Sequence, residues 1–343
     1  MKYFTIAFLL ALIALCAVLF VLPGKIRSAA EAKSGYGVAA TTYPIWVLTR
    51  EVVDGTGIDV QLLTPPDAGC PHDYVLTPND LMKVSAARKP LLLFKNGAGL
   101  DDHICKAALS ASKGIVVIDT GAGIEVIGDD DEHDHDHEAD DHDHEADDHD
   151  EHEGADDHEE HEEGHHHHHH GSENGHFFAS PYEARKIVAT IADELAKSNQ
   201  IHAVKFRENA AKLDKRLQIL GDEFKAQLEP HASKHVAAQH NIFDYLLRDC
   251  GFETPLAIFA DPETPPSPAE ITKMREEFKE HGIKVIFTEP QYPDDLAKLI
   301  GEEIGATVVK IDPVASGPAD PPVGYYFDVM KNNLEIMKKA FSE

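Results

Sequence analysis

Three histidines and one carboxylate stand where strands are expected to end or helices to begin. His240 and Asp312 come shortly after two predicted strands, His72 lies in the loop after a third, and His176 precedes a predicted helix. Because ligands bind beyond the carboxyl ends of parallel strands, these four side chains can converge on one site. Three neutral imidazoles and one carboxylate form a donor set that suits zinc.

Each of these residues also has an explanation without a metal. His72 follows a proline, as surface-loop residues often do, and His240 at a strand end can bond a backbone carbonyl. His176 can be the last member of a histidine-rich tract, and Asp312, which precedes a proline, suits a turn or a cap. Position alone therefore leaves the ligand set open.

Two further residues lie near this set in the sequence. Cys70 comes two residues before His72, and Glu289 follows a predicted strand, where it suits either a turn or a metal ligand. In an exported protein two of Cys70, Cys105 and Cys250 can pair, but the three cannot all pair with one another, and the sequence does not choose. Buried thiols are the alternative.

One segment carries most of the charge. Residues Asp129 to Gly175 hold 15 of the 23 histidines, 23 acidic residues and no Lys or Arg, so −23 of the formal charge of −30 lies there and the remainder is at −7. The chain lacks the basic surface that nucleic acid requires. With almost no apolar residues, this insert is predicted to be a disordered loop that gathers metal, or else a charged linker.

The N-terminus has the pattern of an export signal. Lys2 precedes an uncharged, mostly apolar run at 4–22, and small residues follow at 28–30. Residues 1–30 are therefore predicted to be a signal peptide, or a retained membrane anchor, since the run is just long enough to span a bilayer. Lipid attachment at Cys16 is disfavoured because Leu15 is bulky. We expect a periplasmic or other extracytoplasmic location.

Strand-length apolar runs alternate with helical patterns in residues 31–200 and again in 231–343. This alternation predicts an α/β fold of two lobes, each a mostly parallel sheet flanked by helices. Between them, at 201–230, apolar residues recur at spacings of three and four, which predicts a helix about 40 Å long. One long, rigid helix joining the lobes leaves a cleft between them for the metal.

Six ordered motifs resemble the zinc and manganese class of solute-binding receptors of ABC transporters. The motifs are Thr41–Ile45, Cys70–Tyr74 with Thr77–Leu81, Asn96–Leu100, His176–Pro181, His240–Tyr245, and Phe287–Gln291 with Ile311–Pro313. The resemblance runs from about Gly37 to the C-terminus and excludes the insert. It implies that His72, His176 and His240 are ligands and that Asp312 is the nearby carboxylate and candidate fourth ligand.

The resemblance also bears on the metal and the partner. Manganese receptors of this class tend to carry a carboxylate where this chain has His240, and imidazole suits zinc better than manganese. Nickel and copper also bind imidazole well. We therefore predict a monomeric receptor that delivers Zn²⁺ to the membrane permease of an ABC transporter, with Mn²⁺ or another divalent metal as the alternative cargo.

Two other classes of protein compete with this interpretation. A metal storage or buffering protein would account for the insert, although it would not need two lobes and ordered ligand motifs. A zinc hydrolase needs an open coordination position and a general base, and the sequence has no His-Glu-x-x-His motif. We predict that the chain is not an enzyme.

Overall fold

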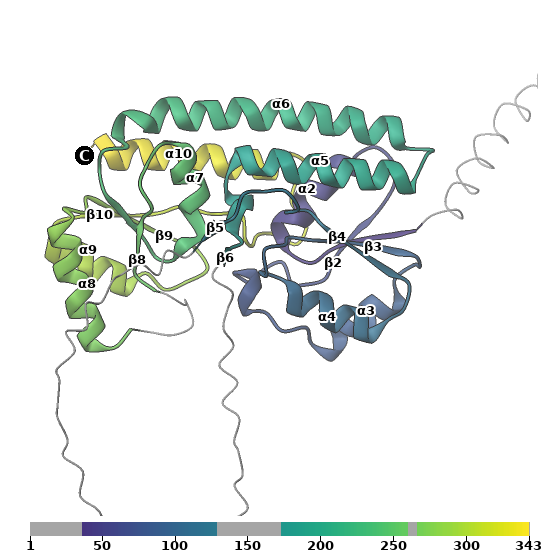
Figure 1. Cartoon of the computed structure of the whole chain (residues 1–343), viewed down its shortest axis with the longest axis horizontal. Coiled ribbons are helices and arrows are strands. Elements are labelled where there is room, and N and C mark those ends of the chain that lie inside the picture. Colours follow the sequence, from purple (N-terminus) through teal and green to yellow (C-terminus); the bar gives the residue numbers. More distant parts are fainter. Residues whose placement is uncertain (1–35, 129–172, 260–265, 343) are drawn as a thin grey trace, which may run out of the picture.

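The computed structural model describes residues 36–128, 173–259 and 266–342 (Figure 1). The predictions made for residues 1–30 and for most of the histidine-rich insert lie outside the described residues. Within the described ranges, no helix combines the length and the apolar character that a membrane crossing requires.

The first lobe is built on a four-stranded sheet of order β2-β1-β3-β4, in which all neighbours are parallel. Helices α3 and α4 cover one face, and α2 and α5 cover the other (Figure 1). The strands are β1 (Gly37–Ala40), β2 (Val60–Leu62), β3 (Leu91–Lys95) and β4 (Ile115–Asp119). The helices are α2 (Tyr43–Val53), α3 (Pro78–Ala86), α4 (Asp102–Ala111) and α5 (Pro181–Ser198).

The second lobe repeats this plan with a parallel sheet of order β10-β9-β7-β8. Its strands are β7 (Val236–Ala238), β8 (Leu256–Ala257), β9 (Val285–Thr288) and β10 (Thr307–Lys310). Its helices are α7 (Asp244–Asp249), α8 (Pro268–Glu280), α9 (Asp295–Ile304) and α10 (Tyr325–Ser342). The predicted fold class, two mostly parallel sheets flanked by helices, is confirmed.

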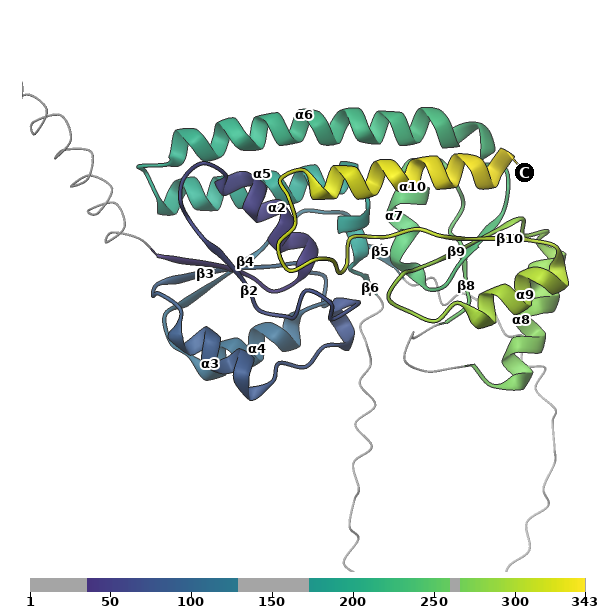
Figure 2. The same cartoon turned by 180° about the vertical axis from the view of Figure 1, so that it is seen from behind.

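The long helix expected between the lobes is α6 (Ala203–Leu228), followed by the 3-10 turn η3 (Glu229–His231). It runs along both lobes and packs against α2, α5 and α10 (Figure 2). Its buried face, which includes Leu213, Leu217 and Phe224, belongs to one apolar core that continues from the first sheet to the second. Separating the lobes would therefore expose this core to water, which disfavours a large movement of one lobe relative to the other.

Local signals in the sequence start and stop several of these helices. Before α3, the Thr77 side chain accepts a hydrogen bond from the Asp80 N–H while the Asp80 carboxylate accepts one from the Thr77 N–H, and Pro78 occupies the first turn. After α9, Gly305 adopts φ 73°, the left-handed conformation that favours glycine at a helix end.

The histidine-rich insert joins two short antiparallel strands, β5 (Ile127–Gly128) and β6 (Glu173–Asn174). The sequence interpretation placed residues 173–175 in a disordered loop, and this boundary is corrected. The ladder holds residues 173 and 174, and the Tyr245 hydroxyl donates to the Asn174 carbonyl at 2.6 Å and accepts from the Ile127 N–H at 3.0 Å. Contacts with residues distant in the sequence therefore give this segment a defined structure.

Candidate metal centre

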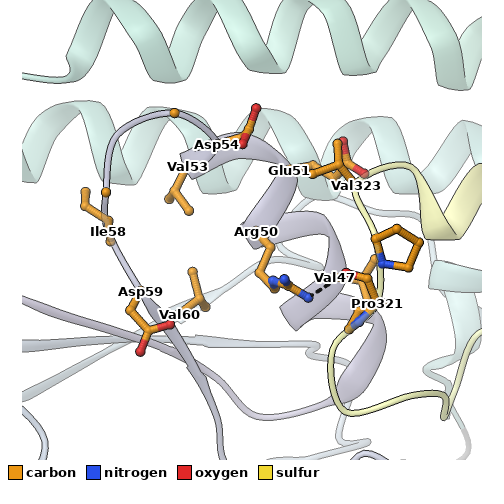
Figure 3. A pocket seen from close by; sticks show the side chains of 13 residues that line it. Val47, Arg50, Glu51, Val53, Asp54, Ile58, Asp59, Val60, Pro321 and Val323 are labelled. Atoms are coloured by element: carbon orange, nitrogen blue, oxygen red, sulfur yellow. Dashed lines mark hydrogen bonds between the residues drawn. The ribbon is translucent and has the colours of Figure 1, made fainter.

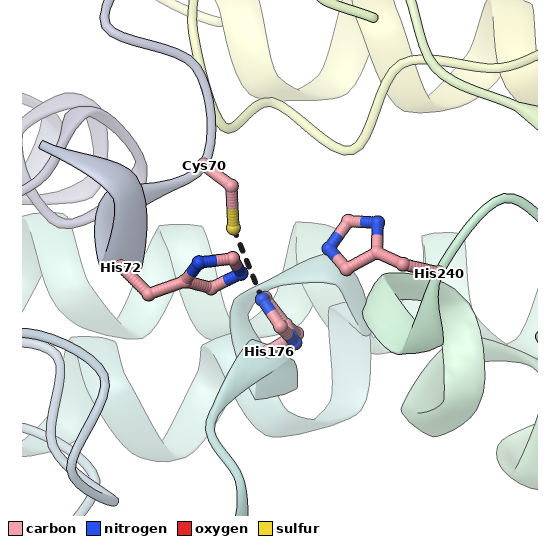
Figure 4. A group of neighbouring side chains, drawn as sticks. All are labelled: Cys70, His72, His176 and His240. Carbon is pink, nitrogen blue, oxygen red and sulfur yellow. Dashed lines mark hydrogen bonds between the residues drawn. The ribbon is translucent and has the colours of Figure 1, made fainter. Parts of the chain in front are cut away.

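Four potential metal ligands converge between the two lobes, namely Cys70, His72, His176 and His240 (Figure 4). One ligand atom from each lies within 4.8 Å of every other. The imidazole centroids are 5.6 Å apart for His72 and His176, 5.9 Å for His72 and His240, and 5.0 Å for His176 and His240. Cys70, His176 and His240 are buried, and His72 is partly exposed.

Cys70 and His72 come from the loop after β2, in which Pro71–Asp73 form the 3-10 turn η1. Gly69, directly before Cys70, adopts φ 81°, a conformation that residues with a β-carbon rarely adopt. On the other side of the turn, the Tyr74 carbonyl accepts a hydrogen bond from His103 Nε2 at 2.9 Å. This hydrogen bond ties the C-terminal side of the turn that carries the two donors to α4.

His176 begins the 3-10 turn η2 (His176–Ala179), directly before α5. Asn174 Oδ1 lies 2.9 Å from both the backbone N–H and Nδ1 of His176, so it accepts from each. With its proton on Nδ1, the ring presents the lone pair of Nε2, which lies 3.1 Å from the Cys70 sulfur. The Asn174 amide also donates to the Asn241 carbonyl at 2.8 Å and to Asp244 at 2.9 Å, which links His176 to the second lobe.

Hydrogen bonds from the second lobe also hold η2 in place. The Tyr326 hydroxyl of α10 donates to the Phe178 carbonyl at 3.0 Å, and the Ser180 hydroxyl donates to Asp249 of α7. Ser180 simultaneously caps α5 by accepting from the Tyr182 N–H. His176 is therefore positioned by both lobes, although in the chain it lies within the first lobe.

His240 lies between β7 and the 3-10 turn η4 (Asn241–Phe243). Its Nδ1 donates a hydrogen bond to Glu289, which follows β9 and is fully buried. Its Nε2 is buried and has no hydrogen-bond partner among the described residues. Metal-ligating histidines commonly donate one ring N–H to a carboxylate, which orients the imidazole and leaves the other ring nitrogen for the metal. His240 and Glu289 have this arrangement.

Burial and the neighbouring imidazoles of His240 and His72 lower the pKa of His176 well below its usual range. His176 is therefore neutral at pH 7, the state in which an imidazole can bind a metal. The structure thus provides at His176 a neutral nitrogen donor that is shielded from solvent.

The structure brings three of the four predicted site residues together and leaves the fourth outside the group. The Asp312 carboxylate accepts the Val314 N–H at 2.8 Å in a turn after β10, and its backbone bonds the Asn333 amide. Burial, and to a smaller extent nearby Glu289, raise the pKa of Asp312. Cys70 joins the three histidines in place of Asp312. Its position two residues before His72 was the feature of the sequence that pointed to it.

The three cysteines after the N-terminal segment are all buried, and no disulfide joins them in the described part of the chain. Cys105 lies on α4 and Cys250 follows α7, and burial raises the pKa of each thiol to about 12. Both are inert core residues at neutral pH, whereas Cys70 faces the imidazoles.

A pocket of about 290 Å³ lies elsewhere, between α2 and the segment before α10 (Figure 3). Arg50 on its wall donates to the Pro321 carbonyl at 3.1 Å and pairs with Asp320. None of the four converging side chains lines this pocket. We assign this pocket no function.

Comparison with known proteins places the chain in a family. A model of the family described as zinc-uptake complex component A, periplasmic, matches residues 38–340. The high-affinity zinc uptake system protein ZnuA of Bacillus subtilis (strain 168) is 27% identical over 308 residues, which cover 88% of this chain and 86% of the relative.

Two solved structures share the fold. FpvC of Pseudomonas aeruginosa in complex with Ni²⁺ has a TM-score of 0.70 at 24% identity and covers 90% of this chain and 97% of its own. A Zn(II)-bound variant of AdcAII of Streptococcus pneumoniae has a TM-score of 0.68 at 21% identity, with 90% and 98% covered. At such identities the likeness establishes the two-lobed architecture alone.

Proposed function

This chain belongs to the periplasmic zinc-uptake complex component A family, as its motifs predicted, and on that premise we propose that it is an extracytoplasmic zinc receptor. It captures Zn²⁺ between its lobes and delivers the ion to the membrane permease of an ABC transporter. The observation that carries the proposal is the convergence of His72, His176 and His240, drawn from both lobes, with ligand atoms within 4.8 Å.

The donor atoms favour zinc over manganese. Imidazole nitrogen suits zinc, whereas manganese prefers oxygen ligands, and no carboxylate of the described residues belongs to the group. The fold does not choose the metal, since structures of FpvC carry Ni²⁺ in one case and Mn²⁺ in another. The choice therefore rests on the side chains that line the site.

The chain binds and delivers the ion and does not catalyse a reaction. A zinc enzyme needs a general base beside the metal, but the buried Glu289 carboxylate is already engaged by His240 and Gln291. His72 comes from the first lobe and His240 from the second, so a small shift between lobes separates donors and weakens binding. We propose that contact with the permease supplies that shift. We also propose that the receptor acts as a monomer.

A competitive zinc titration tests the capture step with the mature chain, its His240→Ala variant and a His281→Ala control. His281 is exposed on the second lobe, away from the group. We expect one tight equivalent in the wild type and the control, and its loss in His240→Ala, with weaker binding to the insert unchanged. Tight binding that survives His240→Ala would count against a site shared by both lobes and favour storage or buffering.

Delivery is tested separately by growth under zinc limitation of cells that depend on this chain. The His240→Ala receptor should fail to support growth, and the His281→Ala receptor should support it. The mass of the exported protein shows whether residues 1–30 are removed or kept as an anchor.

A further inference from the structure

The spacing of the four donor atoms is close to that of a tetrahedral zinc site. With zinc–nitrogen bonds of about 2.0–2.1 Å and a zinc–sulfur bond of about 2.3 Å, tetrahedral ligand atoms lie about 3.3–3.6 Å apart. The ligand atoms of Cys70, His72, His176 and His240 are within 4.8 Å of one another, and the Cys70 sulfur is 3.1 Å from His176 Nε2. Small side-chain shifts close the set around an ion.

No carboxylate of the described residues belongs to the converging group. One Glu289 oxygen accepts from His240 and the other from Gln291, while Asp312 accepts the Val314 N–H. The Cys70 side chain is fully buried and points into the same space as the rings (Figure 4). A second observation marks this space as a ligand site, because the buried Nε2 of His240 has no hydrogen-bond partner among the described residues.

Building on the proposed function, we propose that the Cys70 thiolate is the fourth ligand of the captured ion. The site is then one sulfur and three imidazole nitrogens, and neither Asp312 nor water completes it. On binding, the Cys70 S–H bond breaks, the sulfur–zinc bond forms and one proton leaves to solvent. The bound unit has a net charge of +1, which the Glu289 carboxylate behind His240 offsets.

A thiolate ligand has consequences for selectivity. Sulfur is a soft donor that favours zinc over manganese and magnesium, which prefer oxygen. Cys70 therefore strengthens the discrimination that the imidazoles begin. Replacing the sulfur by a carboxylate in Cys70→Asp should lower the ratio of zinc affinity to manganese affinity. Cys105 is a buried cysteine on α4, and Cys105→Ser should leave this ratio unchanged.

Cobalt(II) replaces zinc in the test because its spectrum reports the ligands. The mature wild-type chain, loaded with one equivalent of Co²⁺, should show a near-ultraviolet sulfur-to-cobalt charge-transfer band and the intense visible bands of a tetrahedral site. The Cys70→Ser variant should lose the charge-transfer band, and Cys105→Ser should keep it. The insert cannot contribute that band, since it contains no cysteine.

Calorimetry in buffers of different ionisation enthalpy supplies a second readout. Zinc should release one proton more from the wild type than from Cys70→Ser, and its affinity should fall about tenfold or more in the variant. Tight cobalt and zinc binding without a sulfur band in the wild type would overturn the assignment of Cys70 and leave the receptor function standing. If the wild type binds no metal tightly, the proposed function itself fails. The wild-type spectrum decides the matter even if Cys70→Ser does not fold.

Discussion

The Glu289 carboxylate accepts a hydrogen bond from Nδ1 of His240, and both side chains are shielded from solvent. The Gln239 amide oxygen accepts the Glu289 N–H at 3.2 Å, and Gln291 donates to the second carboxylate oxygen. The carboxylate thus fixes both the tautomer and the direction of the ring.

We expect Glu289→Gln to weaken zinc binding by about 10- to 100-fold, because a neutral acceptor polarises the ring less. Glu253→Gln is the matched control, since Glu253 pairs with His235 at 3.3 Å on the exposed surface. Competitive zinc titration compares the three proteins. Equal affinities of Glu289→Gln and the wild type would show that the hydrogen bond does not support the ligand.

Asn174→Ala should also weaken zinc binding, by about tenfold, because it removes the group that keeps the proton of His176 on Nδ1. The same change breaks the bridge from η2 to Asp244. Asn199→Ala serves as the control, because Asn199 accepts backbone N–H groups at the far end of α5. Thermal unfolding of both variants separates a loss of affinity from a loss of fold. An Asn174→Ala protein with unchanged affinity would contradict the assigned role.

Removal of residues 129–172 should leave the tight site intact. Gly128 and Glu173 lie opposite each other in the β5–β6 ladder, so a two-residue Asn-Gly turn can replace the insert. Calorimetry should then show one tight zinc equivalent and none of the weaker ones contributed by the insert. A variant that folds but lacks the tight equivalent would place donor groups in the insert and refute a site built from the lobes.

Acid stability should depend on Asp80. Burial raises the pKa of Asp80, but hydrogen bonds, above all from Thr77 and Tyr74, outweigh it and lower the pKa from 3.8 to about 2. Because the folded pKa is depressed, this stabilisation is fully present above about pH 4 and is lost as the pH falls towards 2. The shift corresponds to about 2 kcal/mol of unfolding free energy.

Urea unfolding of Asp80→Asn should accordingly show a deficit of about 2 kcal/mol from pH 7 to pH 5 that narrows below pH 4. Asp193→Asn, an exposed position on α5, should match the wild type at every pH. A deficit that stayed constant down to pH 3 would mean that Asp80 stabilises the turn through packing and not through its charge.

The alternation of strands and helices could be read from the sequence because its causes are local. Apolar residues at spacings of three and four mark α6, Thr77 and Asp80 cap α3, and short apolar runs mark the buried strands. The three histidines were identified through motifs that resemble a known family. Each motif is a short continuous stretch, so it is recognisable without knowing what lies opposite it in space.

The tertiary structure alone decided which donors meet. Residues 70, 176 and 240 are far apart in the chain, and their separation depends on how two sheets pack against α6 and α10. That packing directs Asp312 into a turn with Asn333 and brings the Cys70 sulfur beside the rings. It also orders residues 173–175, whose composition predicted a loop, because hydrogen bonds from Tyr245 and Asn96 reach them from distant segments. Composition and local sequence patterns do not predict such long-range contacts.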